Sequence, residues 1–110
     1  MKSFAADSYL INNATGMRLY NEYAKDMPIF DYHNHISPQE IFENKKFSNI
    51  TELWLGHDHY KWRAMRAAGV DEYFITGDAP DKEKFHKFAQ VTQRLIGSSL
   101  YYWVHMELSH

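Results

Sequence analysis

One short stretch of this chain has the pattern of a β-strand, and the pattern of everything else is helical. Residues 29–36 (Ile-Phe-Asp-Tyr-His-Asn-His-Ile) are bounded by Pro28 and by Ser37-Pro38, which is typical of a single strand. A strand must satisfy its backbone donors and acceptors by pairing with a neighbour. Because no second strand pattern is found, we expect its partners further along the same polypeptide or in another chain.

Helix start and stop signals divide the remainder of the sequence. Asn13 can cap a first helix, and this helix must end by Met27 because the residue before Pro28 is pushed out of the α region. Further starts are predicted at Ser37-Pro38, Asn49, Asp58, Asp78-Ala79-Pro80 and Ser98 or Ser99, with stops at Gly56, Gly69 and Gly97. The expected fold class is therefore mainly α, with one β-strand plus several helices.

Composition excludes several classes of protein. Lys and Arg total 12 against 14 Asp and Glu, for a net charge of −2, so the basic excess of a nucleic-acid-binding protein is absent. No apolar run approaches the ~20 residues of a membrane-spanning helix, and residues 1–10 lack the layout of a secretory signal. We expect a cytoplasmic protein without a nucleic-acid or membrane partner. The chain has no cysteine, so a metal site would need His and carboxylate ligands.

The predicted strand carries the strongest chemical signal, which is the pair His33 and His35. Residues i and i+2 of a strand project from the same face, so the two imidazoles could hold one divalent cation. Asp31 lies on that face too. Two ligands do not complete a site, since a catalytic zinc usually has about three protein ligands plus water. A bare His-x-His is more often just two polar residues at a strand end, and both interpretations stay open on these residues alone.

A second cluster of polar and aromatic side chains spans residues 57–63, with two histidines, a tyrosine and two cations. On a helix His59 and Arg63 share a face because they are four residues apart, whereas Tyr60 points elsewhere. Pattern alone favours the interpretation in which Tyr60 and Trp62 are core aromatics. The remaining histidines stand singly in helical stretches and are expected at the surface: His86, His105 and His110.

Several segments together resemble the uronate isomerase family of the amidohydrolase superfamily. They are residues 23–35 (YAKDMPIFDYHNH), 51–66 (TELWLGHDHYKWRAMR), 69–72 (GVDE) and 75–79 (ITGDA), and the resemblance continues to residues 103–108 (WVHMEL). It implies a (β/α)8 TIM barrel with a helical insertion after its first strand. Residues 1–36 would then supply the N-terminal helix and first barrel strand, and residues 37–110 the helical insertion region. Such a barrel needs ~250 residues, so we expect an N-terminal part, with the remainder of the barrel missing.

The resemblance also implies a reaction in carbohydrate catabolism. Enzymes of this family interconvert D-glucuronate with D-fructuronate and D-galacturonate with D-tagaturonate. By position, His33 and His35 resemble the two metal ligands on strand one, with zinc as the expected cation and manganese as the alternative. His59 and Tyr60 resemble the active-site pair, in which Tyr60 would move a proton between C2 and C1 of the sugar. A homo-oligomer is compatible with this interpretation.

Two other functions stay open at the level of sequence. The first is a different metal-dependent amidohydrolase, a hydrolase, because His-x-His on strand one does not separate the two reactions. The second is a non-catalytic helical interaction domain. That alternative predicts that the 110 residues fold alone, and that the strand is absent or pairs with a partner chain.

Overall fold

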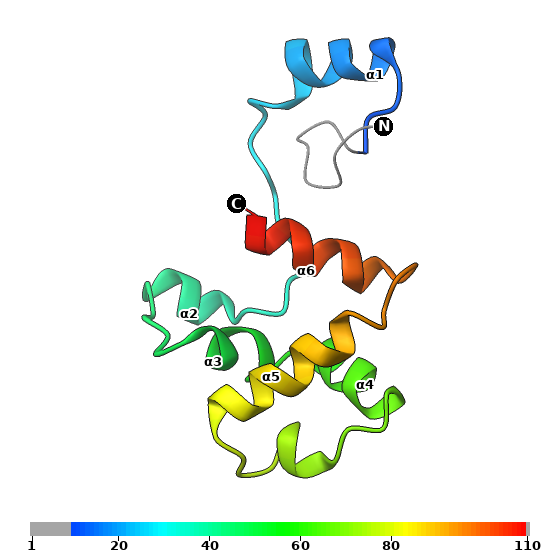
Figure 1. Cartoon of the computed structure of the whole chain (residues 1–110). Coiled ribbons are helices and arrows are strands. Elements are labelled where there is room, and N and C mark those ends of the chain that lie inside the picture. Colours follow the sequence, from blue (N-terminus) through cyan, green and yellow to red (C-terminus); the bar gives the residue numbers. More distant parts are fainter. Residues whose placement is uncertain (1–9, 110) are drawn as a thin grey trace. The chain divides into compact units, whose positions relative to one another are not determined.

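The computed structural model describes residues 10–109, and every regular element within that range is a helix (Figure 1). The elements are, in chain order, α1 (Ala14–Leu19), the π-helix η1 (Tyr20–Ala24), α2 (Pro38–Phe42), α3 (Ile50–Leu55), α4 (His59–Ala67), the 3-10 helix η2 (Glu72–Phe74), α5 (Asp81–Thr92) and α6 (Ser99–Ser109). The mainly α fold class is confirmed for this part of the chain. None of the described helices is long and apolar enough to cross a bilayer.

The strand predicted over residues 29–36 is not seen in the described chain. Residues 28–34 have no regular secondary structure, and the side chain of Ile29 is 92% exposed. A strand exists only within a hydrogen-bonded ladder, and residues 10–109 contain no second strand. The predicted strand is therefore absent from the described residues, and these residues hold no partner that could form it.

The chain divides into two compact units, and the first consists of Met1–Tyr32 with His105–His110. Asn13 begins α1 as expected, because its side-chain oxygen accepts a 2.7 Å hydrogen bond from the backbone N–H of Gly16. The helix continues directly into η1, which ends before Met27, as Pro28 requires. Neither α1 nor η1 contains a buried residue.

The second unit, His33–Val104, has helices that begin at the polar residues singled out by the sequence. Asn49 caps α3 by accepting from the Glu52 N–H at 3.0 Å, and Asp58 caps α4. The Ser98 hydroxyl accepts from the Leu100 N–H at the start of α6. Such caps are each worth ~0.5–2 kcal/mol to a helix, so these boundaries follow from local chemistry.

Two predicted boundaries in this unit need correction. The Ser37 side chain makes no capping hydrogen bond to α2, although Pro38 occupies its first turn as expected. The helix α5 ends at Thr92, well before the predicted stop at Gly97. Beyond Thr92 the backbone tightens, with the N–H of Arg94 bonded to the Val91 carbonyl three residues back. Gly97 serves the following turn instead, with a φ of 90° that a residue without Cβ adopts easily.

A single apolar core lies among the helices of the second unit. Its buried members come from α3, α4, the residue after η2, α5 and α6: Leu55, Met65, Ile75, Phe88 and Val104. The helix α5 packs against both α3 and α4 (Figure 1). The Trp62 indole donates a 2.7 Å hydrogen bond to the Leu55 carbonyl, which ties α4 to the end of α3. This bond and the core together fix the turn from which α4 begins.

We predict that Met65→Ala lowers the free energy of unfolding of the 110-residue chain by about 2–5 kcal/mol, because it leaves a cavity in the core. Met65 has no exposed surface, whereas Met27 is 64% exposed and makes a matched control. Met27→Ala should change the same quantity by less than about 0.5 kcal/mol. Urea denaturation followed by circular dichroism measures both, and equal effects would contradict the assignment of the core.

Candidate active site

The four side chains that the sequence singles out for chemistry gather within the second unit. His33 and His35 precede α2, while His59 and Tyr60 form the first turn of α4. The ring centroid of His35 lies 5.7 Å from that of His33, 5.1 Å from that of His59 and 4.8 Å from that of Tyr60. His35 is thus the centre of the cluster and contacts the other three rings.

Asp58 joins this cluster, although sequence reasoning gave it only the role of a helix start. Its Oδ1 lies 3.2 Å from Nδ1 of His35, and its side chain is 14% exposed. An acid directly before His59 is a visible signal. The contact with His35, 23 residues away along the chain, requires the tertiary structure.

Lys61 forms the inner side of the cluster. Only 7% of the residue is exposed, its Nζ lies 2.6 Å from Oδ2 of Asp58, and the same Nζ lies 5.3 Å from the centroid of the Trp54 ring. Burial on its own would raise the pKa of Asp58, but the hydrogen bond and charge of the Lys61 ammonium, together with the hydrogen bond from His35, hold this pKa below its usual value. The carboxylate is therefore ionised at neutral pH.

Tyr60 lies at the open side of the cluster. Its side chain is 51% exposed, whereas Trp62 packs against the core, so the interpretation as a core aromatic fits Trp62 and not Tyr60. The centroids of the His59 and Tyr60 rings are 4.6 Å apart, and the Arg63 guanidinium lies 5.6 Å from the Tyr60 ring. The Tyr60 side chain is therefore partly accessible from solvent and has two basic side chains beside its ring.

The donors in the cluster fit part of a divalent-metal site. The 5.7 Å between the ring centroids of His33 and His35 allows both imidazoles to reach one cation at zinc–nitrogen distances of ~2.0–2.1 Å. A carboxylate hydrogen-bonded to the other nitrogen, as Asp58 is to His35, is the usual companion of a ligating histidine. No group of three His, Asp or Glu within residues 10–109 is arranged to hold a metal ion. A complete site would therefore need ligands from outside this range.

The chain has four other histidines. His86 is exposed on α5, as expected, and its ring contacts Gln90 at 3.0 Å. His57 is exposed as well. His105, which was expected at the surface, is half-buried on α6, and His110 lies outside the described residues.

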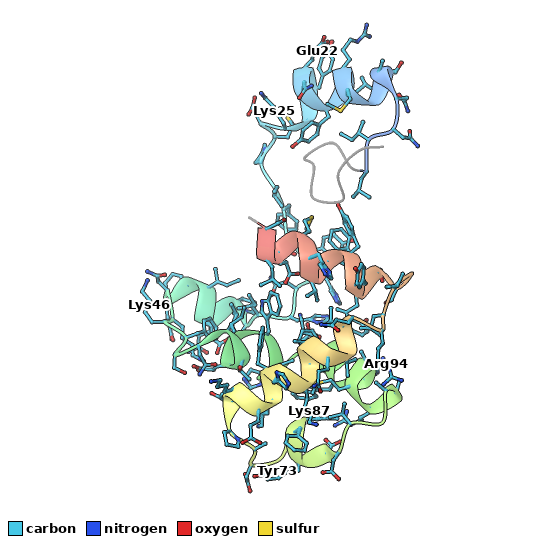
Figure 2. The ribbon with its side chains drawn as sticks, in the orientation of Figure 1. Glu22, Lys25, Lys46, Tyr73, Lys87 and Arg94 are labelled. Atoms are coloured by element: carbon cyan, nitrogen blue, oxygen red, sulfur yellow. The ribbon has the colours of Figure 1, made fainter. Side chains whose placement is uncertain are left out.

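A hollow of about 550 Å³ lies elsewhere in the second unit, between η2 and α5. Lys87 lies on the side of α5 that faces η2 (Figure 2), with its Nζ 5.0 Å from the centroid of the Phe74 ring. Phe85 and His86 also line this hollow, whereas His33, His35, His59 and Tyr60 do not. The His35 cluster is therefore the candidate site because of its side chains, and the hollow beside α5 is separate from it.

Comparison with known proteins identifies the family of this chain. The family model described as glucuronate isomerase matches residues 1–110. Proteins named uronate isomerase are 59% identical in Oceanobacillus iheyensis, 57% in Bacillus subtilis (strain 168) and 56% in Caldicellulosiruptor saccharolyticus, each over 108 residues and 98% of this chain. The chain spans 23% of the length of these curated relatives. Because the family model matches along the whole chain, the protein belongs to the glucuronate isomerase family.

Proposed function

We propose that this chain contributes to an aldose–ketose isomerase that interconverts D-glucuronate with D-fructuronate and D-galacturonate with D-tagaturonate. The observation that carries the proposal is that the rings of His33, His59 and Tyr60 surround the His35 imidazole in a member of this family. In the same proposal, residues 1–36 provide the N-terminal helix and the first strand of a TIM barrel. Residues 37–110 form the helical insertion, and residues 29–36 become a strand when neighbouring strands pair with them.

His33 and His35 would hold a divalent cation, with zinc expected and manganese as the alternative. When bound, such a cation polarises a substrate oxygen. Side chains of this chain would take part in the proton transfer. Once its own proton has passed to a neighbouring base such as His59, the Tyr60 oxygen takes the proton from C2 of the open-chain sugar; the C2–H electron pair becomes the C1=C2 bond of an enediol while O1 gains a proton. Tyr60 then gives its proton to C1 while O2 loses one and becomes the ketose carbonyl. Arg63 supplies positive charge near the Tyr60 ring. His59 lies against that ring, where it can relay the proton or bind the substrate.

Isomerisation is favoured over hydrolysis because the curated relatives carry the name uronate isomerase, whereas a His-x-His pair alone would fit both reactions. A non-catalytic helical interaction domain is the remaining alternative. The packed helices of the second unit are compatible with it, but the match of residues 1–110 to the glucuronate isomerase family favours an enzyme.

The central prediction concerns the Tyr60 hydroxyl. In a chimera, this chain replaces the matching segment of the Bacillus subtilis uronate isomerase. That segment is 57% identical to this chain over 108 residues. The chimera should form ketose from D-glucuronate, and Tyr60→Phe should lower kcat ~10²- to 10⁴-fold, since that is the usual worth of a general acid–base group. Metal content should not change, because only the hydroxyl is removed.

Tyr73→Phe is the matched control, because Tyr73 is a similarly exposed tyrosine (48% against 51%) on η2. This variant should keep the kcat of the chimera. Near-normal turnover of Tyr60→Phe would show that another group carries the proton. A folded chimera that binds metal but forms no ketose would refute the proposed function.

We also predict that His33→Ala and His35→Ala each weaken metal binding by the chimera, because each change removes an imidazole ligand. Metal content after dialysis and competition with a chelator measure this effect. His86→Ala, which removes an exposed imidazole on α5, should leave the affinity unchanged. Unaltered stoichiometry and affinity in both His33 and His35 variants would refute their assignment as ligands.

The 110-residue chain by itself should show no isomerase activity. Two imidazoles leave a cation only half coordinated, and a displacement of reacting groups by about 1 Å can cost ~10²-fold in rate. The measurement is ketose formation from D-glucuronate with the purified chain in excess Zn²⁺ or Mn²⁺. Sustained turnover above the metal-only control would mean that these residues contain a complete site.

A further inference from the structure

The Asp58 carboxylate has more hydrogen bonds than a helix cap requires. Its Oδ1 accepts from the backbone N–H of Tyr60 at 2.9 Å and of Lys61 at 3.3 Å, which is the capping interaction. The same oxygen lies 3.2 Å from Nδ1 of His35, and Oδ2 accepts from Nζ of Lys61 at 2.6 Å. One side chain therefore connects the segment that carries His35 to the turn that carries Tyr60.

We propose that Asp58, supported by Lys61, is a positioning residue that holds His35 in one tautomer and one orientation beside the first turn of α4. A carboxylate can only accept hydrogen bonds, so the His35 hydrogen resides on Nδ1. The lone pair of His35 then belongs to Nε2, the nitrogen left for a cation or a substrate. The inference deepens the proposed function and rests on it where it concerns the metal; the tautomer itself does not depend on the reaction.

Lys61 supplies the second half of this arrangement. A buried ammonium is costly unless it is paired, and Lys61 has Oδ2 of Asp58 on one side and the Trp54 ring on the other. Trp54 packs against the hydrophobic core. The position of the carboxylate is therefore set by the core through Lys61, and Oδ1 is directed at His35.

The identity of the residue follows from these contacts. Serine, threonine and asparagine cap helices about as well as aspartate does, but each offers a single acceptor oxygen of the side chain without charge. At this position Oδ1 serves the cap and His35, while Oδ2 of the same charged carboxylate serves Lys61. Capping alone would therefore not require aspartate here.

The test compares Asp58→Ser with Asp71→Ser. Asp71 also caps a helix, since it accepts from the Tyr73 N–H at 2.8 Å, but it does not belong to the His35 cluster. The first readout is the tautomer of His35 in the metal-free 110-residue chain, from long-range ¹H–¹⁵N correlation spectra above pH 7, with His35→Gln assigning the signal. We expect Nδ1–H in the wild type and in Asp71→Ser, and a shift towards Nε2–H in Asp58→Ser.

The second readout is zinc affinity of the chimera described above. Asp58→Ser should weaken it ~10- to 100-fold, the usual effect of losing a carboxylate partner of a ligating histidine, while Asp71→Ser should leave it unchanged. If Asp58→Ser fails to fold by circular dichroism, Lys61→Met replaces it, because that variant keeps the Asp58 cap and an unbranched apolar side chain near Trp54 while it removes the ammonium that supports the carboxylate. It should shift both readouts in the same direction.

The outcomes separate this inference from the proposed function. A wild-type tautomer and wild-type zinc affinity in the folded Asp58 or Lys61 variant would overturn the positioning role, whether or not the chimera is active. A changed tautomer in the Asp58→Ser chain, together with a chimera that never forms ketose, would support the positioning role and refute only the isomerase.

Discussion

Burial of apolar side chains among α3, α4 and α5 is the interaction on which the rest of the second unit depends. Side chains such as Met65 and Phe88, both essentially inaccessible, contribute ~1.5–3 kcal/mol each when they leave water. None of these helices is longer than 12 residues, and helices of that length are marginal in isolation. Packing therefore holds α3, α4 and α5 together, and this packed group of helices sets the direction in which α4 begins.

The polar cluster lies at the start of α4, beside the packed helices. Lys61 and Trp62 both lie in α4, and both reach back to α3: the Lys61 ammonium lies over the Trp54 ring, and the Trp62 indole donates to the Leu55 carbonyl. These contacts hold the turn between α3 and α4, from which Asp58 extends toward His35. A site assembled in this way derives its geometry from apolar packing even though its own members are polar and partly exposed.

The segment before α2 shows why the sequence pattern of a strand does not by itself produce one. Residues 29–36 have the alternation and flanking prolines of a strand, and the segment contains the two histidines that matter most. Strand structure is not a property of a segment alone, since its hydrogen bonds run to a neighbour, and residues 10–109 supply none. His33 and His35 still approach each other, but the reason cannot be strand alternation, because no strand is formed.

The sequence by itself determined those features that depend only on residues a few positions apart, such as the starts of helices. Asn13, Asn49 and Asp58 each accept from an N–H two or three residues ahead, so these helix starts were readable, as was the choice of imidazole and phenol groups for chemistry. Only the tertiary structure decided that His35 meets Asp58 and Tyr60. Contacts across more than 20 residues depend on how helices pack around a core, and no local pattern encodes that packing.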